Sequence, residues 1–283
     1  MPRPFSVVDL PDRAVMGVVN VTPDSFSDGG RFLDPARAVA HGRELVAAGA
    51  TLLDVGGEST RPGADPVAVD EELRRVLPVV EALAADGAAP VSIDTSKAVV
   101  AGEALRCGAT IVNDVTAGLA DPGLLGVVAD SGAALVVMHM QGEPRTMQRA
   151  PHYDDVTREV AEFLRARLDA ARAAGIRDDA LLADPGIGFG KTTAHNLELL
   201  ARLADLRATV GVPLVVGASR KSFLGAITGD DLPADRDDAT LATTVWSFTQ
   251  GARIVRVHDV ATSARVARLL DVMSRATPEG VAA

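Results

Sequence analysis

Short aliphatic runs recur along the chain, and each is followed by a longer stretch in which apolar residues have helical spacing. The runs lack the strict apolar–polar alternation of a strand with one wet face, so they predict strands buried on both faces, as in a parallel sheet. The eight runs are AVMGVV (14–19), TLLDV (51–55), PVSID (90–94), ATIVN (109–113), ALVVM (134–138), ALLAD (180–184), PLVVG (213–217) and ARIVRV (252–257).

The intervening stretches predict amphipathic helices, because they begin with acidic, Ser, Asp or Pro residues and many end in Gly. Examples are residues 34–50, 70–87, 96–109, 154–175 and 194–211. No linker or low-complexity block interrupts the repeats. The pattern predicts an α/β protein with one (β/α)8 TIM-barrel domain over residues 1–283, a barrel core at about 14–275 and a frayed C-terminal tail. An open doubly wound sheet seldom needs eight regular repeats.

Charge and composition argue against some classes of binding partner. A net charge of −10 opposes non-specific binding to nucleic acid or anionic membrane, and 3% aromatic content argues against stacking of nucleobases. An anionic substrate would therefore need local cations. The single cysteine, Cys107, cannot form an internal disulfide and favours a reducing compartment. With no signal peptide and no apolar run of membrane-spanning length, the sequence predicts a soluble, cytoplasmic protein.

Polar residues stand at or near the carboxyl end of every predicted strand, where the chemistry of a TIM barrel gathers. Each taken singly is explained as a helix cap or a packing residue, but the recurrence at all eight strands favours a functional site. These residues are Asn20, Asp54, Asp94, Asn113, His139, Asp184, the SRKS run at 219–222, and Arg256 with His258.

Two kinds of ligand chemistry follow from the residue types. Asp94, Asn113 and Asp184 supply carboxylates and an amide, which suit a flat heterocycle rich in N–H donors. Such a ring is the first expected ligand.

The second kind is anionic. Lys221, Arg256 and His258 are cations near one barrel mouth, and with backbone amides at a helix start they predict a phosphate or diphosphate site. Asn20 offers one neutral oxygen to a Mg²⁺ ion that keeps waters and binds substrate phosphates.

Other chemistries find less support. The GIGFGKTT stretch at 186–193 lacks the spacing of a nucleotide-binding loop and is explained as a tight strand-to-helix turn. The chain has no H-E-x-x-H motif and no G-x-S-x-G elbow. The VTPDSFSDGG segment at 21–30 has the composition of a mobile lid at the mouth, with an ordinary solvated loop as the alternative.

Eight motifs in order resemble those of the dihydropteroate synthases, a family of pterin-binding barrels in folate biosynthesis that sulfonamides inhibit. The likeness runs from about Met16 to Val260, and ESTRPGA and SRKSFLG have no general structural reason to exist. The motifs are MGVVNVTPDSFSDGG, DVGGESTRPGA, SIDTSK, IVNDVTAG, VVMHMQGEPRTMQ, LLADPGIGFGKT, VGASRKSFLG and RVHDV.

The resemblance implies a transferase that joins 6-hydroxymethyl-7,8-dihydropterin diphosphate to 4-aminobenzoate and releases diphosphate. It implies a homodimer, and Mg²⁺ as cofactor with Asn20 as its ligand. The implied catalytic residues are Asp94, Lys221, Arg256 and His258. The implied pterin diphosphate-binding residues are Thr60, Asp94, Asn113, Met138, Asp184, Phe189, Lys221, Arg256 and His258. The implied aminobenzoate-binding residues are Ser59, Thr60, Arg61, Pro62, Phe189, Lys221 and Ser222.

Two alternatives remain open. A methyltetrahydrofolate–corrinoid methyltransferase would share the pterin barrel but would not need the STRPG and SRKS motifs. A non-catalytic pterin-binding barrel would keep the pocket and lose the cations. The segment at 231–247 is richer in Asp than in many relatives, which puts in doubt only the connection between the last two strands.

Overall fold

The computed structural model describes residues 5–22, 35–59 and 63–276 of the chain. Its eight strands form one parallel sheet in the order β6-β5-β4-β3-β2-β1-β8-β7. The outer strands β6 and β7 meet through a bridge between Ala183 and Leu214, which closes the sheet into a barrel. The strands are β1 (Ala14–Asn20), β2 (Leu52–Gly56), β3 (Val91–Asp94), β4 (Ile111–Asp114), β5 (Ala134–Met138), β6 (Leu181–Asp184), β7 (Val215–Val216) and β8 (Ile254–Val257). The predicted TIM barrel is confirmed.

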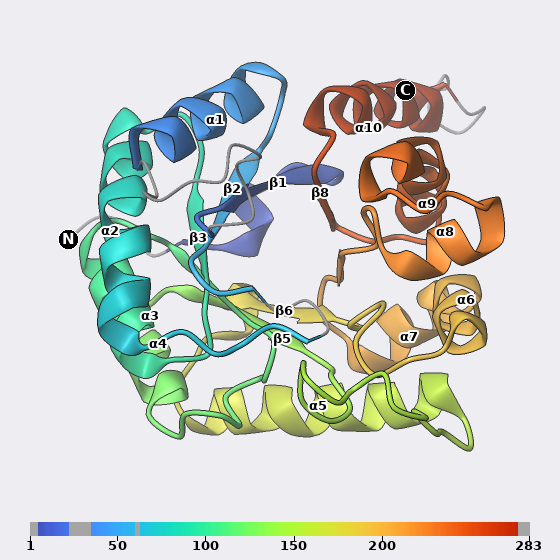
Figure 1. Ribbon diagram of the computed structural model, residues 1–283, viewed down its shortest axis with the longest axis horizontal. Coiled ribbons are helices and arrows are strands. Elements are labelled where there is room, and N and C mark those ends of the chain that lie inside the picture. The colour runs from blue at the N-terminus through green and yellow to red at the C-terminus, as the bar shows by residue number, and fades with distance from the viewer. Residues whose placement is uncertain (1–4, 23–34, 60–62, 277–283) are drawn as a thin grey trace.

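Helices surround the strands, as Figure 1 shows. They are α1 (Pro35–Ala47), α2 (Val69–Asp86), α3 (Ala98–Arg106), α4 (Leu124–Ser131), α5 (Val156–Ala173), α6 (Thr193–Ala201), α7 (Leu203–Val210), α8 (Ser222–Thr228), α9 (Asp237–Thr249) and α10 (Val260–Arg275). Short 3₁₀ turns add η1 (Val7–Asp9), η3 (Asp178–Ala180) and η4 (Pro233–Arg236). Among the described residues, no helix combines the length and apolar character that a membrane span requires.

Local signals in the sequence account for these helices. Helix α2 buries Val76, Val79 and Leu83 on one side and ends at Gly87, whose φ of 63° is a left-handed conformation that glycine adopts without strain. Helix α5 begins after Asp155, whose side chain accepts a hydrogen bond from the Arg158 backbone N–H and so caps the first turn.

One predicted helix is wrong. Residues 194–211 were expected as a single helix, but the structure breaks it at Arg202, whose φ of −103° and ψ of 24° leave the helical region. No Gly or Pro marks the break. It occurs because the two halves pack differently: α6 contacts α8 and α9 as well as α5, whereas α7 packs on α5.

The N-terminal segment covers the end of the barrel at which the strands begin. Val7 and Leu10 are buried there. The Ser6 hydroxyl donates to the Asp179 carbonyl over 3.3 Å, and Arg177 Nη2 donates to the Phe5 carbonyl over 2.8 Å. These contacts lie just before β6, so the opposite end, where the strands finish, is the open one.

The register places the polar strand ends at one level. Asn20 of β1 pairs with Gly56 of β2, Gly56 with Asp94 of β3, and Asp94 with Asn113 of β4. Parallel strands in this register bring residues that are far apart in the sequence onto one rim.

Candidate active site

A charged network joins four strands at this rim. Arg256 of β8 donates from Nε to Asp54 Oδ2 over 2.6 Å and from Nη2 to Asp94 Oδ2 over 2.9 Å. Asn113 Nδ2 donates to the same Asp54 oxygen over 3.1 Å. Asp54 is fully buried, and Asp94 and Asn113 are nearly so. The structure therefore brings together four of the predicted strand-end residues, of which Asp54 had no predicted ligand contact.

Burial governs the protonation of this network. It raises the pKa of Asp94 to about 7, and the neighbouring Asp54 charge acts in the same direction, against the opposing effect of Arg256. For Arg256, burial works against the charge, but the two carboxylates hold its pKa above the ordinary value. Within the described chain, the second carboxylate oxygen of Asp54, Oδ1, is buried and has no hydrogen-bond partner. It is an acceptor available to a bound donor.

Lys221 approaches the same rim from the turn before α8. Its Nζ lies 4.2 Å from the centre of the Phe189 ring, a cation–π contact, and donates to the Ile187 carbonyl. Burial lowers the pKa of Lys221 to about 7, although the charge of Asp184 opposes the shift. Burial likewise raises the pKa of Asp184, and the positive charge of Lys221 opposes that rise. The two residues thus lie close enough for their charges to interact.

Two apolar side chains flank this region. Met138 ends β5, is buried, and lies opposite Asp184 in the register. Phe189 is half-buried in the connection after β6. Asp184 itself accepts a hydrogen bond from the Gly186 N–H over 2.7 Å. A carboxylate near two such side chains, which we call the apolar walls, suits a flat ring with N–H donors.

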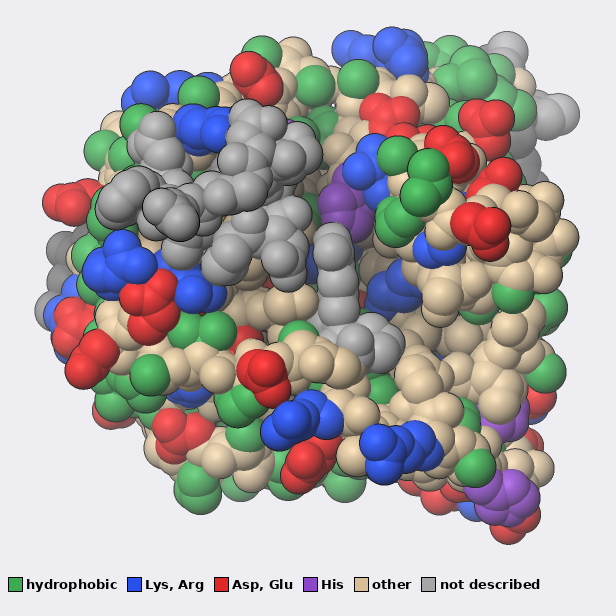
Figure 2. All heavy atoms as spheres, in the orientation of Figure 1, with side chains coloured by type: hydrophobic (Ala, Val, Ile, Leu, Met, Phe, Trp, Pro, Cys, Tyr) green, Lys and Arg blue, Asp and Glu red, His purple; other side chains and the backbone are tan. Residues whose placement is uncertain are grey.

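His258 and Ser219 form a pair beside Lys221. Ser219 Oγ lies 3.0 Å from His258 Nδ1 and accepts from the His258 backbone N–H over 3.2 Å. Ser222 is exposed and is the first residue of α8. In Figure 2, a histidine and several Lys or Arg side chains gather around the hollow in the middle of this face.

Not all of the predicted site residues lie in the described part of the chain. Thr60, Arg61 and Pro62 lie outside the described residues, as does most of the 21–30 segment. Ser59 is half-buried after β2, and Asn20 is half-buried at the end of β1.

Asn20 offers a metal ion few protein ligands. Within the described chain, no cluster of three or more His, Cys, Asp or Glu could hold one. A Mg²⁺ bound largely by phosphate oxygens and water needs few protein ligands, so the single amide oxygen of Asn20 fits such an ion.

The sequence predicts no ligand contact for Asp54, Lys191 or Arg220, although Asp54 and the SRKS run stand among the polar strand ends. Asp54 was noticed as a strand end, but its contact with Arg256 spans 202 positions of sequence and has no local signal. Lys191 lies in a glycine-rich stretch whose sequence predicts only a tight strand-to-helix turn. Arg220 has a positive φ of 59°, which is unusual for a residue with a side chain and marks a constrained turn before Lys221.

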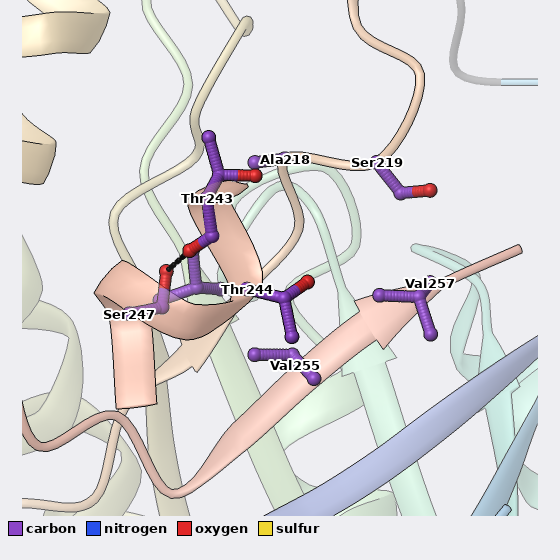
Figure 3. A pocket seen from close by; sticks show the side chains of 8 residues that line it. Ala218, Ser219, Thr243, Thr244, Ser247, Val255 and Val257 are labelled. Atoms are coloured by element: carbon purple, nitrogen blue, oxygen red, sulfur yellow. Dashed lines mark hydrogen bonds between the residues drawn. The ribbon is translucent and has the colours of Figure 1, made fainter. Parts of the chain in front are cut away.

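A small hollow lies between α9 and strands β7 and β8 (Figure 3). It is lined by Val216, Ala218, Ser219, Thr243, Thr244, Ser247, Val255 and Val257. The Ser247 hydroxyl donates to the Thr243 carbonyl over 2.7 Å. None of these eight side chains carries a charge, so the hollow offers hydroxyl donors but no counter-charge for an anion.

Comparison with known proteins places these features in a family. A family model described as "Pterin binding enzyme" matches residues 16–258. The dihydropteroate synthase of Escherichia coli K12 is 48% identical over 264 residues, covering 93% of each chain. That of Mycobacterium leprae is 48% identical over 272 residues, covering 94% of this chain and 95% of the relative.

Solved structures agree. Dihydropteroate synthase from Xanthomonas albilineans with 4-aminobenzoic acid superimposes with a TM-score of 0.88 at 49% identity, covering 96% of this chain and 95% of that one. The enzyme of the same organism in complex with 7,8-dihydropteroate gives a TM-score of 0.85 at 45% identity, covering 97% of each chain.

Proposed function

The chain belongs to the pterin-binding enzyme family, and we propose that it is a dihydropteroate synthase. In this reaction the amine of 4-aminobenzoate bonds to the methylene carbon of 6-hydroxymethyl-7,8-dihydropterin diphosphate, the bond from that carbon to oxygen breaks, and diphosphate leaves. The observation that carries the proposal is the convergence, at one end of the barrel, of the carboxylate–arginine network with Lys221 and the apolar walls.

The pterin site rests on hydrogen-bond acceptors held by strands. Asp184 and Asn113 offer oxygens to the ring N–H groups and exocyclic amine, and the buried Oδ1 of Asp54 is a further acceptor. Met138 and Phe189 would cover the two sides of the ring. Because these groups are fixed by the sheet and by the β6–α6 connection, the site is preorganised.

The leaving group would be held by cations. Arg256 uses two of the five N–H donors of a guanidinium for Asp54 and Asp94, so it keeps donors for an anion while the carboxylates fix its orientation. His258, positioned by Ser219, would contact the diphosphate as well. Charge builds on the leaving oxygen as the bond to carbon breaks, so these contacts strengthen in the transition state.

The reaction does not need a strong general base. The arylamine is neutral near pH 7 and attacks through its own lone pair, after which its extra proton is lost to solvent or to a nearby acceptor. Asp94 would stabilise positive charge that develops on the pterin methylene carbon, provided it is ionised. The protein contributes chiefly by orienting the two substrates and by stabilising the departing anion.

Three further parts of the proposal rest on the family resemblance. Asn20 would hold a Mg²⁺ ion, which when bound neutralises diphosphate charge. Ser59, Thr60, Arg61, Pro62 and Ser222 would contact 4-aminobenzoate with Phe189 and Lys221. The protein would be a cytoplasmic homodimer.

Release of diphosphate tests the function. We expect it only when 6-hydroxymethyl-7,8-dihydropterin diphosphate and 4-aminobenzoate are both present, with a rate that falls when Mg²⁺ is chelated. A protein that binds the pterin diphosphate but releases nothing with 4-aminobenzoate would instead be a non-catalytic pterin-binding barrel. Methyl transfer from methyltetrahydrofolate to a corrinoid would establish the methyltransferase alternative.

A further inference from the structure

Lys191 is a buried lysine that the proposed reaction does not use. Its side chain lies in the connection between β6 and α6 and is only 3% exposed. Burying an ammonium group is costly unless it is well hydrogen-bonded, so a buried lysine in this place needs a structural or functional reason.

Its hydrogen bonds cross between two connections. Lys191 Nζ lies 2.9 Å from His139 Nδ1, 3.3 Å from the His139 carbonyl oxygen and 3.0 Å from the Phe189 carbonyl oxygen. His139 directly follows β5. The side chain therefore joins the end of β5 to the β6–α6 connection, with three acceptors around one nitrogen.

The His139 ring is suited to accept this bond. Burial, with a contribution from Lys191, lowers the pKa of His139 to about 3, so the ring is neutral at pH 7. In the tautomer that carries its proton on Nε2, Nδ1 accepts from Lys191. The ring is held edge-on against Phe163, with ring centres 4.9 Å apart.

The backbones of the two connections are also in contact. Gly186 has a φ of 67°, and a Cβ there would overlap the His139 carbonyl oxygen. Gly190 has a φ of 61°, and a Cβ there would overlap the Gln141 carbonyl oxygen. Glycine at both positions lets the β6–α6 connection lie directly on residues 139–141.

The residues joined in this way are neighbours of the two apolar walls. Met138 precedes His139, and Phe189 supplies one of the carbonyls that Lys191 holds. We propose that Lys191 is a positioning residue that fixes the spacing between Met138 and Phe189, and thereby the width of the slot that receives the pterin ring. The inference rests on the proposed function, because it assigns that slot to the pterin.

The test is the affinity of each variant for 6-hydroxymethylpterin, measured by calorimetry. Lys191→Met keeps the length of the side chain and removes its donors. We expect its dissociation constant to rise about tenfold, because small displacements of positioning groups are costly. The Michaelis constant for 4-aminobenzoate should rise less than the pterin dissociation constant, because only one of the two walls, Phe189, is proposed to contact that substrate. A loss of stability alone would lower the unfolding midpoint but would not affect the pterin constant more than the aminobenzoate constant.

Tyr153→Phe is the matched control. The Tyr153 hydroxyl donates to the Gly190 carbonyl over 2.9 Å, so this variant loses a hydrogen bond on the same connection but not one between the walls. We expect its pterin affinity to stay within twofold of wild type. Equal weakening in both variants would overturn the assignment to Lys191, because loosening of the connection as a whole would then explain the result.

His139→Phe keeps the ring packing and removes one of the three acceptors, so a smaller loss of pterin affinity is expected if Lys191→Met does not fold. Unchanged pterin affinity in whichever variant folds would overturn the inference. If the wild-type protein itself binds no pterin, the proposed function fails instead, so the two failures are distinguishable.

Discussion

The guanidinium of Arg256 has two roles that cannot be separated by mutation to Ala. In the proposed function it contacts the diphosphate, and in the structure it holds Asp54 and Asp94 in place. Its removal would leave two buried carboxylates close together without a counter-charge. The identities of the residues at the strand ends were predictable from the sequence, because buried strands end in polar residues at regular intervals. Their pairing was not, because it depends on which strands face each other across the barrel.

The lowered pKa of Lys221 predicts a pH effect on stability. In the unfolded chain a lysine stays protonated up to about pH 10.4, whereas in the folded protein the pKa is about 7. Between these values the unfolded state binds more protons, so the free energy of unfolding rises with pH. We expect wild type to gain stability between pH 7.5 and 9, by at most about 1.4 kcal/mol per pH unit from this group, and Lys221→Met to lack that gain.

Urea unfolding of both proteins across this range checks the prediction. Lys191 has a lowered pKa too, through burial and the charge of Lys221, so the difference between the curves reports Lys221 together with its effect on Lys191. Asp94 titrates in the opposite sense below this range, between the ordinary carboxyl pKa and about 7. Parallel curves for the two proteins would show that Lys221 keeps an ordinary pKa.

At the scale of elements, the turn that presents Lys221 is clamped by η4 and α9. The Arg220 backbone N–H donates to Thr240 Oγ1 over 3.0 Å, and Arg236 Nη1 donates to the Arg220 carbonyl over 3.1 Å. The Arg220 guanidinium makes two hydrogen bonds, of 2.7 and 2.8 Å, to the Asp237 carboxylate. The Asp-rich segment at 231–247, which the sequence marked only as a departure, thus fixes the turn in its left-handed conformation.

Asp237→Asn should therefore impair catalysis without touching substrate. The amide keeps the shape of the carboxylate but loses its charge and one acceptor, so Lys221 is held less firmly. We expect kcat/KM to fall on the order of fivefold, measured by diphosphate release. Glu162→Gln is the control, because it removes an exposed ion pair with Arg158 on α5 and should leave kcat/KM unchanged.

Arg220→Gly distinguishes the side chain from the backbone. Glycine adopts a φ of 59° without strain, so this variant tolerates the turn conformation while losing the ion pair. We expect it to resemble Asp237→Asn. Wild-type kcat/KM in Arg220→Gly would mean that the backbone conformation alone positions Lys221.

At the scale of the molecule, periodicity was enough to predict the barrel. All eight predicted runs contain the observed strands or most of their residues, because strands buried on both faces are aliphatic throughout. Periodicity did not predict the features that depend on contacts between distant elements. The break at Arg202 and the shortness of β7, which spans Val215–Val216 within the predicted 213–217, follow from packing between distant elements rather than from local sequence.

The proposed homodimer is a property of the whole molecule that sedimentation measures directly. A chain of 29.2 kDa should then sediment at twice that mass. Two groups stand out among the exposed large apolar side chains of the described chain: Leu197, Ile227 and Trp246 on the mutually packed helices α6, α8 and α9, and Leu269, Val272 and Met273 on α10.

We expect the face of three helices to form the interface, because a specific dimer buries about 800 Å² per partner, more than a single helix face supplies. Ile227→Glu should then shift the protein to monomer, whereas Leu269→Glu should leave the dimer intact. Sedimentation at low and at high salt completes the test, since repulsion between two chains of net charge −10 weakens association at low ionic strength. Monomeric wild type at both salt concentrations would refute the dimer, and dissociation by Leu269→Glu alone would move the interface to α10.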